Sequence, residues 1–170
     1  SVLGGLEDFY DTPYPMVESS LEAQTSTRKI QLNMYRAAVA TDDATAQALL
    51  DEIDGVAAKM NTALDTLRAS YKGDPSLMTT LNNAADDLAS ARQSALDYLT
   101  AGDEDNAIAV LNGEYAQAGT AFSEIIDEFI AAAQTEADTY YESGHSIKNI
   151  CTWILLALAA FCLIFTVFMA

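Results

Sequence analysis

Apolar residues recur at alternating steps of three and four positions along separate stretches of this chain. Such spacing places apolar side chains along one face of an α-helix, because two helical turns take about seven residues. The clearest stretch starts after Asp42 or Asp43 and ends near Tyr71. Its apolar positions are Ala46, Leu49, Ile53, Val56, Met60, Ala63 and Leu67. Four stretches of this kind predict an all-α fold in which each helix buries one face against the others.

Turn signals set the limits of these helices. The first helix is expected over about residues 15–41, since a proline fits the first turn of a helix. After the second helix, Gly73 is expected in the left-handed conformation, Asp74 as the N-cap and Pro75 as the first helical residue. The sequence Ala101-Gly102-Asp103 repeats this pattern, with Asp103 as an N-cap.

Long helices joined by short loops predict an up-down-up-down four-helix bundle with antiparallel neighbours. The fourth helix keeps its apolar spacing from Ile108 to Ala132, and nothing after Ala132 clearly breaks it. We therefore expect it to continue into the segment that follows. The sequence divides into a lead-in segment over residues 1–14, a bundle over 15–147 and a membrane helix over 148–170.

The membrane prediction rests on a sharp change in composition. Charged side chains end at Lys148, and residues 149–170 carry none. A run of about 20 apolar residues is long enough to span a bilayer. This run lies at the C-terminal end, whereas a secretory signal peptide is N-terminal. We therefore predict a C-terminal transmembrane helix, with further protein before Ser1 and after Ala170.

The bundle region is strongly acidic. The chain has 25 Asp and Glu residues against 8 Lys and Arg residues, for a formal net charge of -17. This balance argues against a nucleic-acid partner, because binding to phosphates requires a basic surface. A strongly acidic domain beside a membrane also favours a position on the extracytoplasmic side of the cell membrane.

Catalytic motifs are absent from the sequence. Its one histidine, His145, lies just before the apolar run, and both cysteines, Cys151 and Cys162, lie inside it. A Ser-His-Asp triad or a di-iron site cannot be assembled in the bundle from these residues. We expect no catalytic residue, no metal and no cofactor, and we do not expect an enzyme.

The first helix carries an unusual cluster of basic residues. No acid occurs between Glu22 and Asp42, whereas Arg28, Lys29 and Arg36 all fall there. This helix also has a second line of residues beside its apolar seam, which a lone bundle does not need and which predicts a homodimer. The line consists of Val17, Leu21, Gln24, Arg28, Gln31, Tyr35 and Ala38.

Arg28 and Arg36 are the leading candidates for binding an anion, because a guanidinium group pairs with a carboxylate through two hydrogen bonds. The alternative is that both arginines neutralise acids of the other helices or of a partner. Lys29 points away from Arg28 and is expected to be solvated. Counting residues from the shared end of the bundle places Gln117 of the fourth helix level with Arg28. The complete candidate site is Arg28, Arg36, Gln24, Gln31, Tyr35, Tyr115, Gln117 and Thr120.

Two segments resemble the four-helix-bundle sensor domain of bacterial methyl-accepting chemotaxis receptors and related sensor kinases. Residues 9–17, FYDTPYPMV, resemble the start of that domain after its first membrane helix. Residues 98–107, YLTAGDEDNA, resemble its turn between helices three and four. A fourth helix that runs into a membrane helix also matches this family.

The resemblance implies a homodimeric extracytoplasmic receptor in the plasma membrane. In the family, a small ligand binds near the dimer interface between helices one and four, and arginines of helix one bind the carboxylate in the aspartate and serine receptors. Arg28 and Arg36 are similar in residue type and helix. The resemblance also implies a first membrane helix before Ser1 and a HAMP-like linker with a signalling module after Ala170.

Three alternatives stay open at this point. The sensor could act through a ligand-carrying binding protein, or it could control a histidine kinase or a cyclase. The chain could also be a membrane-anchored structural dimerisation bundle without a small-molecule ligand.

Overall fold

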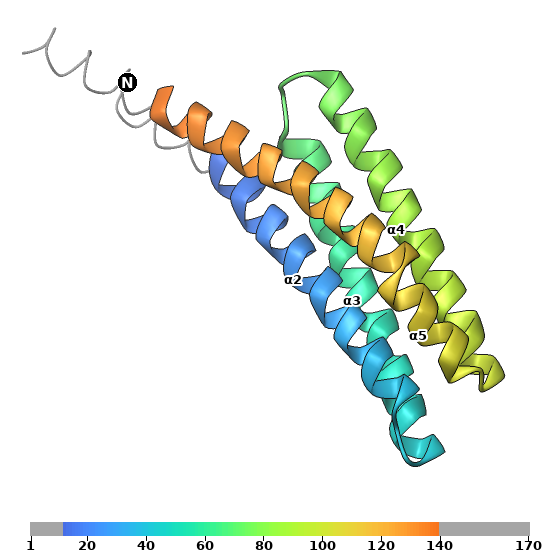
Figure 1. The fold of residues 1–170 in the computed structure, drawn as a ribbon. Coiled ribbons are helices and arrows are strands. Elements are labelled where there is room, and N and C mark those ends of the chain that lie inside the picture. The colour runs from blue at the N-terminus through green and yellow to red at the C-terminus, as the bar shows by residue number, and fades with distance from the viewer. Residues whose placement is uncertain (1–11, 140–170) are drawn as a thin grey trace, which may run out of the picture.

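The computed structural model describes residues 12–139, which form an elongated bundle of helices (Figure 1). No strand occurs among these residues. The predicted all-α class and four-helix bundle are therefore confirmed. The helices are α2 (Pro13–Ala38), α3 (Asp43–Ser70), α4 (Pro75–Ala101), α5 (Glu104–Asn112) and a further helix over residues 114–139. The last two together take the place of the predicted fourth helix.

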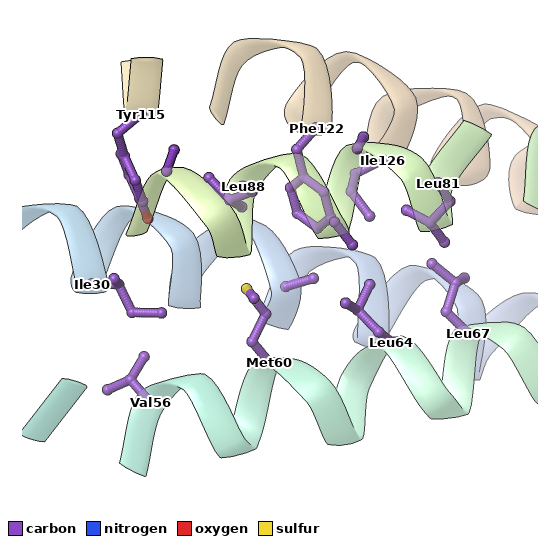
Figure 2. Packing of buried hydrophobic residues seen from close by; sticks show 14 of the residues in the cluster. Ile30, Val56, Met60, Leu64, Leu67, Leu81, Leu88, Tyr115, Phe122 and Ile126 are labelled. Atoms are coloured by element: carbon purple, nitrogen blue, oxygen red, sulfur yellow. The ribbon is translucent and has the colours of Figure 1, made fainter. Parts of the chain in front are cut away.

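The core follows the apolar seams that the sequence indicates. Figure 2 shows labelled side chains from α2, α3, α4 and residues 114–139 pointing toward one another. Tyr115, Phe122 and Phe129 of the last helix are the largest fully buried side chains. Each buried large apolar side chain contributes about 1.5–3 kcal/mol through the hydrophobic effect. The seam of α2 is buried along its whole length: Met16, Ser20, Ala23, Thr27, Ile30, Met34 and Ala37.

Aspartates cap the N-termini of three helices. The Asp42 carboxylate accepts a hydrogen bond from the Thr45 backbone N–H at 2.8 Å, and Asp74 accepts one from Ser76 at 2.8 Å. Asp103 caps α5 in the same way, through the Asn106 backbone N–H. The hydrogen bonds from Thr45 and Ser76 lower the pKa of Asp42 and of Asp74, because they stabilise the charged forms. The N-caps predicted at Asp74 and Asp103 are confirmed.

The two glycine turns differ from each other. Gly102 ends α4 in the left-handed conformation at φ 72°, and it is the one residue with positive φ among residues 12–139. The left-handed conformation predicted for Gly73 is wrong. A Cβ atom at Gly73 would lie 2.5 Å from the Tyr71 ring, which itself packs edge-on against Phe129. A side chain at position 73 would therefore displace the Tyr71 ring, so the small size of Gly73, rather than backbone freedom, matters at this turn.

The predicted fourth helix is interrupted at Gly113. Its φ of -102° and ψ of -95° leave the helical region, and α5 ends at Asn112. The Gly113 N–H donates to Ala109 O and Val110 O, and the next helix begins at residue 114. Asn112 is also held to α2, because the Tyr35 hydroxyl donates to its Oδ1 atom at 2.6 Å. The break separates a segment packed on α4 from the segment over residues 114–139.

Lys29 links α2 to α3 through an ion pair with Glu52. Its Nζ atom lies 2.6 Å from Glu52 Oε1, and the buried Asn33 amide donates to Glu52 Oε2 at 3.0 Å. The hydrogen bond from Lys29 is the largest cause of a lowered pKa of Glu52, and the hydrogen bond from Asn33 is the next. Lys29 is exposed, as expected, and its ammonium group also pairs with Glu52.

Among residues 12–139, no helix combines the length and hydrophobicity needed to cross a membrane. The predicted membrane helix over 148–170 and most of the lead-in segment lie outside the described residues.

Candidate ligand pocket

A pocket of about 380 Å³ lies between α2 and the helix over residues 114–139. This volume is within the usual range for small-molecule sites. From α2 the lining residues are Gln24, Thr27, Arg28 and Gln31. From the other helix they are Tyr115, Ala116, Gly119, Thr120, Phe122, Ser123, Glu124 and Asp127. The small residues Ala116 and Gly119 leave room beside the longer side chains of α2.

Tyr115 joins the pocket to the core. It is 1% exposed, and its hydroxyl donates a hydrogen bond of 3.2 Å to the backbone carbonyl of Thr27. Burial raises the pKa of Tyr115 well above its usual value, and the positive charge of Arg92 on α4 partly opposes this shift. The Tyr115 hydroxyl is therefore a neutral group that fixes the distance between the two helices at the pocket.

Gln24 makes a second link across the pocket. Its Nε2 atom donates to Asp127 Oδ1 at 2.7 Å and to Ser123 Oγ at 3.2 Å. Both acceptors belong to the helix over residues 114–139. A ligand that competes for the Gln24 amide or the Asp127 carboxylate would therefore change how the two helices are held together.

Arg28 is an exposed cation at this pocket. It forms neither a hydrogen bond nor an ion pair within the part of the chain that the structure describes. For the alternative interpretation, in which Arg28 neutralises an acid of another helix, the structure shows no ion pair of Arg28 among residues 12–139. The five donors of its guanidinium group are available to an anionic ligand.

The structure brings together five of the eight residues of the predicted site. Tyr35 instead bonds to Asn112, outside the pocket lining. Arg36 is exposed and acts on Glu52, whose pKa its charge helps to lower. Gln117 is exposed and does not line the pocket. The residues brought together are Gln24, Arg28, Gln31, Tyr115 and Thr120.

The sequence interpretation missed the acidic side of the pocket. Ser123, Glu124 and Asp127 follow Thr120 at three, four and seven positions, so all four share one face of a helix. This spacing could have extended the predicted site. Arg92 of α4 lies outside the pocket lining, and among residues 12–139 its buried Nη1 atom has no hydrogen-bond partner.

Within residues 12–139, no cluster of three His, Cys, Asp or Glu side chains could hold a metal ion. The pocket offers a guanidinium group, carboxylates, amides and hydroxyls beside the buried rings of Tyr115 and Phe122. This set of groups suits the reversible binding of a small polar molecule.

Comparison with known families gives one match, which covers most of the chain. Residues 5–147 match a family described as a four helix bundle sensory module for signal transduction. No curated protein matches the chain.

Proposed function

Because this chain belongs to the family of four-helix-bundle sensory modules for signal transduction, we propose that it senses a small ligand for a bacterial chemoreceptor. The pocket around Arg28 is the observation that carries the proposal. This arginine has no ion-pair partner among residues 12–139 and lines a pocket between two helices, so it suits a carboxylate-bearing ligand. The proposal has the domain outside the cytoplasm, in an up-down-up-down bundle without catalytic activity.

The position of the pocket supports a way to transmit the signal. A ligand there contacts both α2 and the helix over residues 114–139, so it can favour one relative position of the two helices over another. In the sequence, the helix over residues 114–139 precedes the predicted membrane helix over residues 148–170. Small helix shifts of about 1–2 Å are a known switching movement. We propose that such a shift carries the signal across the membrane.

An exposed apolar line on α2 supports a homodimer. Four of its members are exposed hydrophobic residues: Tyr14 (50%), Leu21 (51%), Leu32 (55%) and Val39 (67%). They are spaced by seven and eleven residues, which are two and three helical turns, and so they lie in one line. Arg28 lies within about 40° of this line on the helix surface. A second copy packed on this line would therefore lie beside the pocket.

Paired arginine variants test the function. The 170-residue chain in detergent micelles is screened by thermal shift against amino acids, organic acids and neutral metabolites. A ligand at 100 times its dissociation constant stabilises the fold by about 2.7 kcal/mol. We expect a carboxylate-bearing ligand to stabilise the wild type, and Arg28→Ala to weaken its binding at least tenfold.

Arg36→Ala is the matched control, since Arg36 is an exposed arginine of the same helix outside the pocket. Equal binding by the Arg28→Ala and wild-type proteins would contradict the assignment of the site. A screen without any stabilising compound would favour a ligand-carrying binding protein or a purely structural bundle. Assays of kinase and cyclase activity would distinguish a chemoreceptor from a histidine kinase or a cyclase.

A further inference from the structure

The pocket contains charges of both signs that do not pair with each other. Arg28 lies on α2, whereas Glu124 and Asp127 lie on the helix over residues 114–139. No ion pair joins Arg28 to either carboxylate. One cation and two carboxylates give the lining a formal charge of -1. A ligand between the two helices therefore meets a positive group on one side and negative groups on the other.

Both carboxylates have oxygen atoms that are free to bind a ligand. Glu124 has no hydrogen-bond or ion-pair partner among residues 12–139. Asp127 uses its Oδ1 atom to accept from Gln24, which leaves Oδ2 for another donor. Ser123 directly precedes Glu124 in the chain, and its hydroxyl accepts a hydrogen bond from the same Gln24 amide. Asp127 is thus held in place without being neutralised, and Glu124 keeps its whole carboxylate for a ligand.

Charge decides which small molecules this arrangement favours. A carboxylate at Arg28 gains one attraction, and a cationic group on the same molecule gains a second from Glu124 and Asp127. A dianion also gains the first attraction, but its other negative group faces two like charges. We propose that Glu124 and Asp127 form a cation-binding subsite, which selects small molecules with one anionic and one cationic group and disfavours dianions.

This inference rests on the proposed function, and it narrows the class of ligand. An organic diacid fits Arg28 alone, whereas a molecule with a carboxylate and an ammonium-type nitrogen uses both sides of the pocket. Because both acids are exposed, water and salt weaken each interaction. We therefore expect each carboxylate to change dianion binding by about fivefold rather than by orders of magnitude.

Matched compounds and variants test the subsite by isothermal titration calorimetry on the 170-residue chain in detergent micelles. The pairs are 4-aminobutyrate with succinate, L-glutamine with L-glutamate, and L-asparagine with L-aspartate. We expect the member without net negative charge to bind more tightly in each pair that binds. The variants Glu124→Gln and Asp127→Asn should each reduce this preference by about fivefold, through tighter binding of the negatively charged member and, for 4-aminobutyrate, weaker binding of its ammonium group. Asp127→Asn keeps an oxygen that can accept from Gln24.

Glu128→Gln is the control for a general loss of negative charge, because Glu128 is an exposed acid of the same helix outside the pocket. It should leave the preference unchanged. Tighter binding of the negatively charged members to the wild type would overturn the inference while leaving the proposed sensor intact. An equal preference in the wild type and both pocket variants would also overturn it. Absence of binding by every compound at millimolar concentration would overturn both the inference and direct sensing at this pocket.

Discussion

At the scale of single residues, Tyr115 has two structural roles. Its ring belongs to the buried core, and its hydroxyl holds the backbone of α2 at the edge of the pocket. An intramolecular hydrogen bond of this kind contributes about 1 kcal/mol to stability. A tyrosine is the residue that meets both needs, because it combines a large apolar ring with a hydroxyl at its tip.

The titration of Tyr115 makes the protein less stable at high pH. Its pKa is raised in the folded state, so the unfolded chain releases this proton first as the pH rises above 10.0. The folded state then binds more protons than the unfolded state, and stability falls with rising pH. We expect Tyr115→Phe to lose about 1 kcal/mol at neutral pH. Above pH 10.0 the free energy of unfolding of this variant should fall less steeply with pH than that of the wild type. The two slopes should differ by up to about 1.4 kcal/mol per pH unit.

Urea unfolding followed by circular dichroism at neutral and alkaline pH measures both effects. The tyrosines besides Tyr115 serve as an internal reference, since both proteins contain them. Identical alkaline slopes in the wild type and the variant would show that Tyr115 is not the cause of the decline.

At the scale of helices, two glycines have opposite effects on stability. Gly55 lies in the middle of α3 on an exposed face, and a Cβ atom there would meet nothing within 4 Å. Gly102 needs its backbone freedom, because its φ of 72° is unfavourable for residues with a Cβ atom. The sequence marks both residues only as glycine, and their positions in the helices decide their roles.

Alanine substitutions separate these two roles. We expect Gly55→Ala to stabilise the fold by about 0.5–1 kcal/mol, because alanine favours the helix and restricts the unfolded chain. Gly102→Ala should destabilise it by about 1–2 kcal/mol through strain in the left-handed conformation. Thermal unfolding in detergent micelles compares both variants with the wild type, at about 2–4 °C per kcal/mol. Shifts in the same direction for the two variants would contradict this assignment.

At the scale of the whole molecule, the exposed face of α2 determines how two copies would meet. The bundle already has a continuous core without this face. Leu21 and Leu32 are each more than half exposed, and so they contribute little to the stability of one copy. In the proposed dimer their exposed halves become buried, and this would add about 0.8–1.5 kcal/mol for each leucine.

Charge substitutions on this face test the dimer. Leu21→Glu and Leu32→Glu should each weaken dimerisation at least tenfold without unfolding the bundle. Sedimentation of the 170-residue chain in detergent measures the change, and circular dichroism verifies the fold. Ala58→Glu serves as the control, because it adds the same charge at an exposed position of α3. A dimer of unchanged strength in both leucine variants would place the interface elsewhere or show that α2 has another partner.

Most of the fold could be predicted from the sequence. The seam of α2 is buried as predicted, and α4 starts at Pro75 behind the Asp74 cap. On the last helix the prediction is one position off in two places, since Ile126 and Ala133 are buried more deeply than Ile125 and Ala132.

The candidate site could be predicted only in part. Arg28 stood out as a base in an acidic chain, and the antiparallel count directed attention to Tyr115 and Thr120. Arg36 and Gln117 belong to the same two helices but lie outside the pocket. Residue spacing determines which side chains share a face of one helix. It does not determine which faces of two helices meet.

The sequence by itself determined where α3, α4 and α5 begin, which side of α2 is buried and where Asp74 and Asp103 cap helices. These features depend on residues within about one or two turns of each other. The tertiary structure alone decided that Gly73 provides space for Tyr71 and that Gln24 bonds to Asp127, 103 residues further along the chain. It also decided that Arg28, Glu124 and Asp127 share one pocket. Such contacts depend on how two helices are rotated and shifted against each other, and this is set by the packing of the whole core.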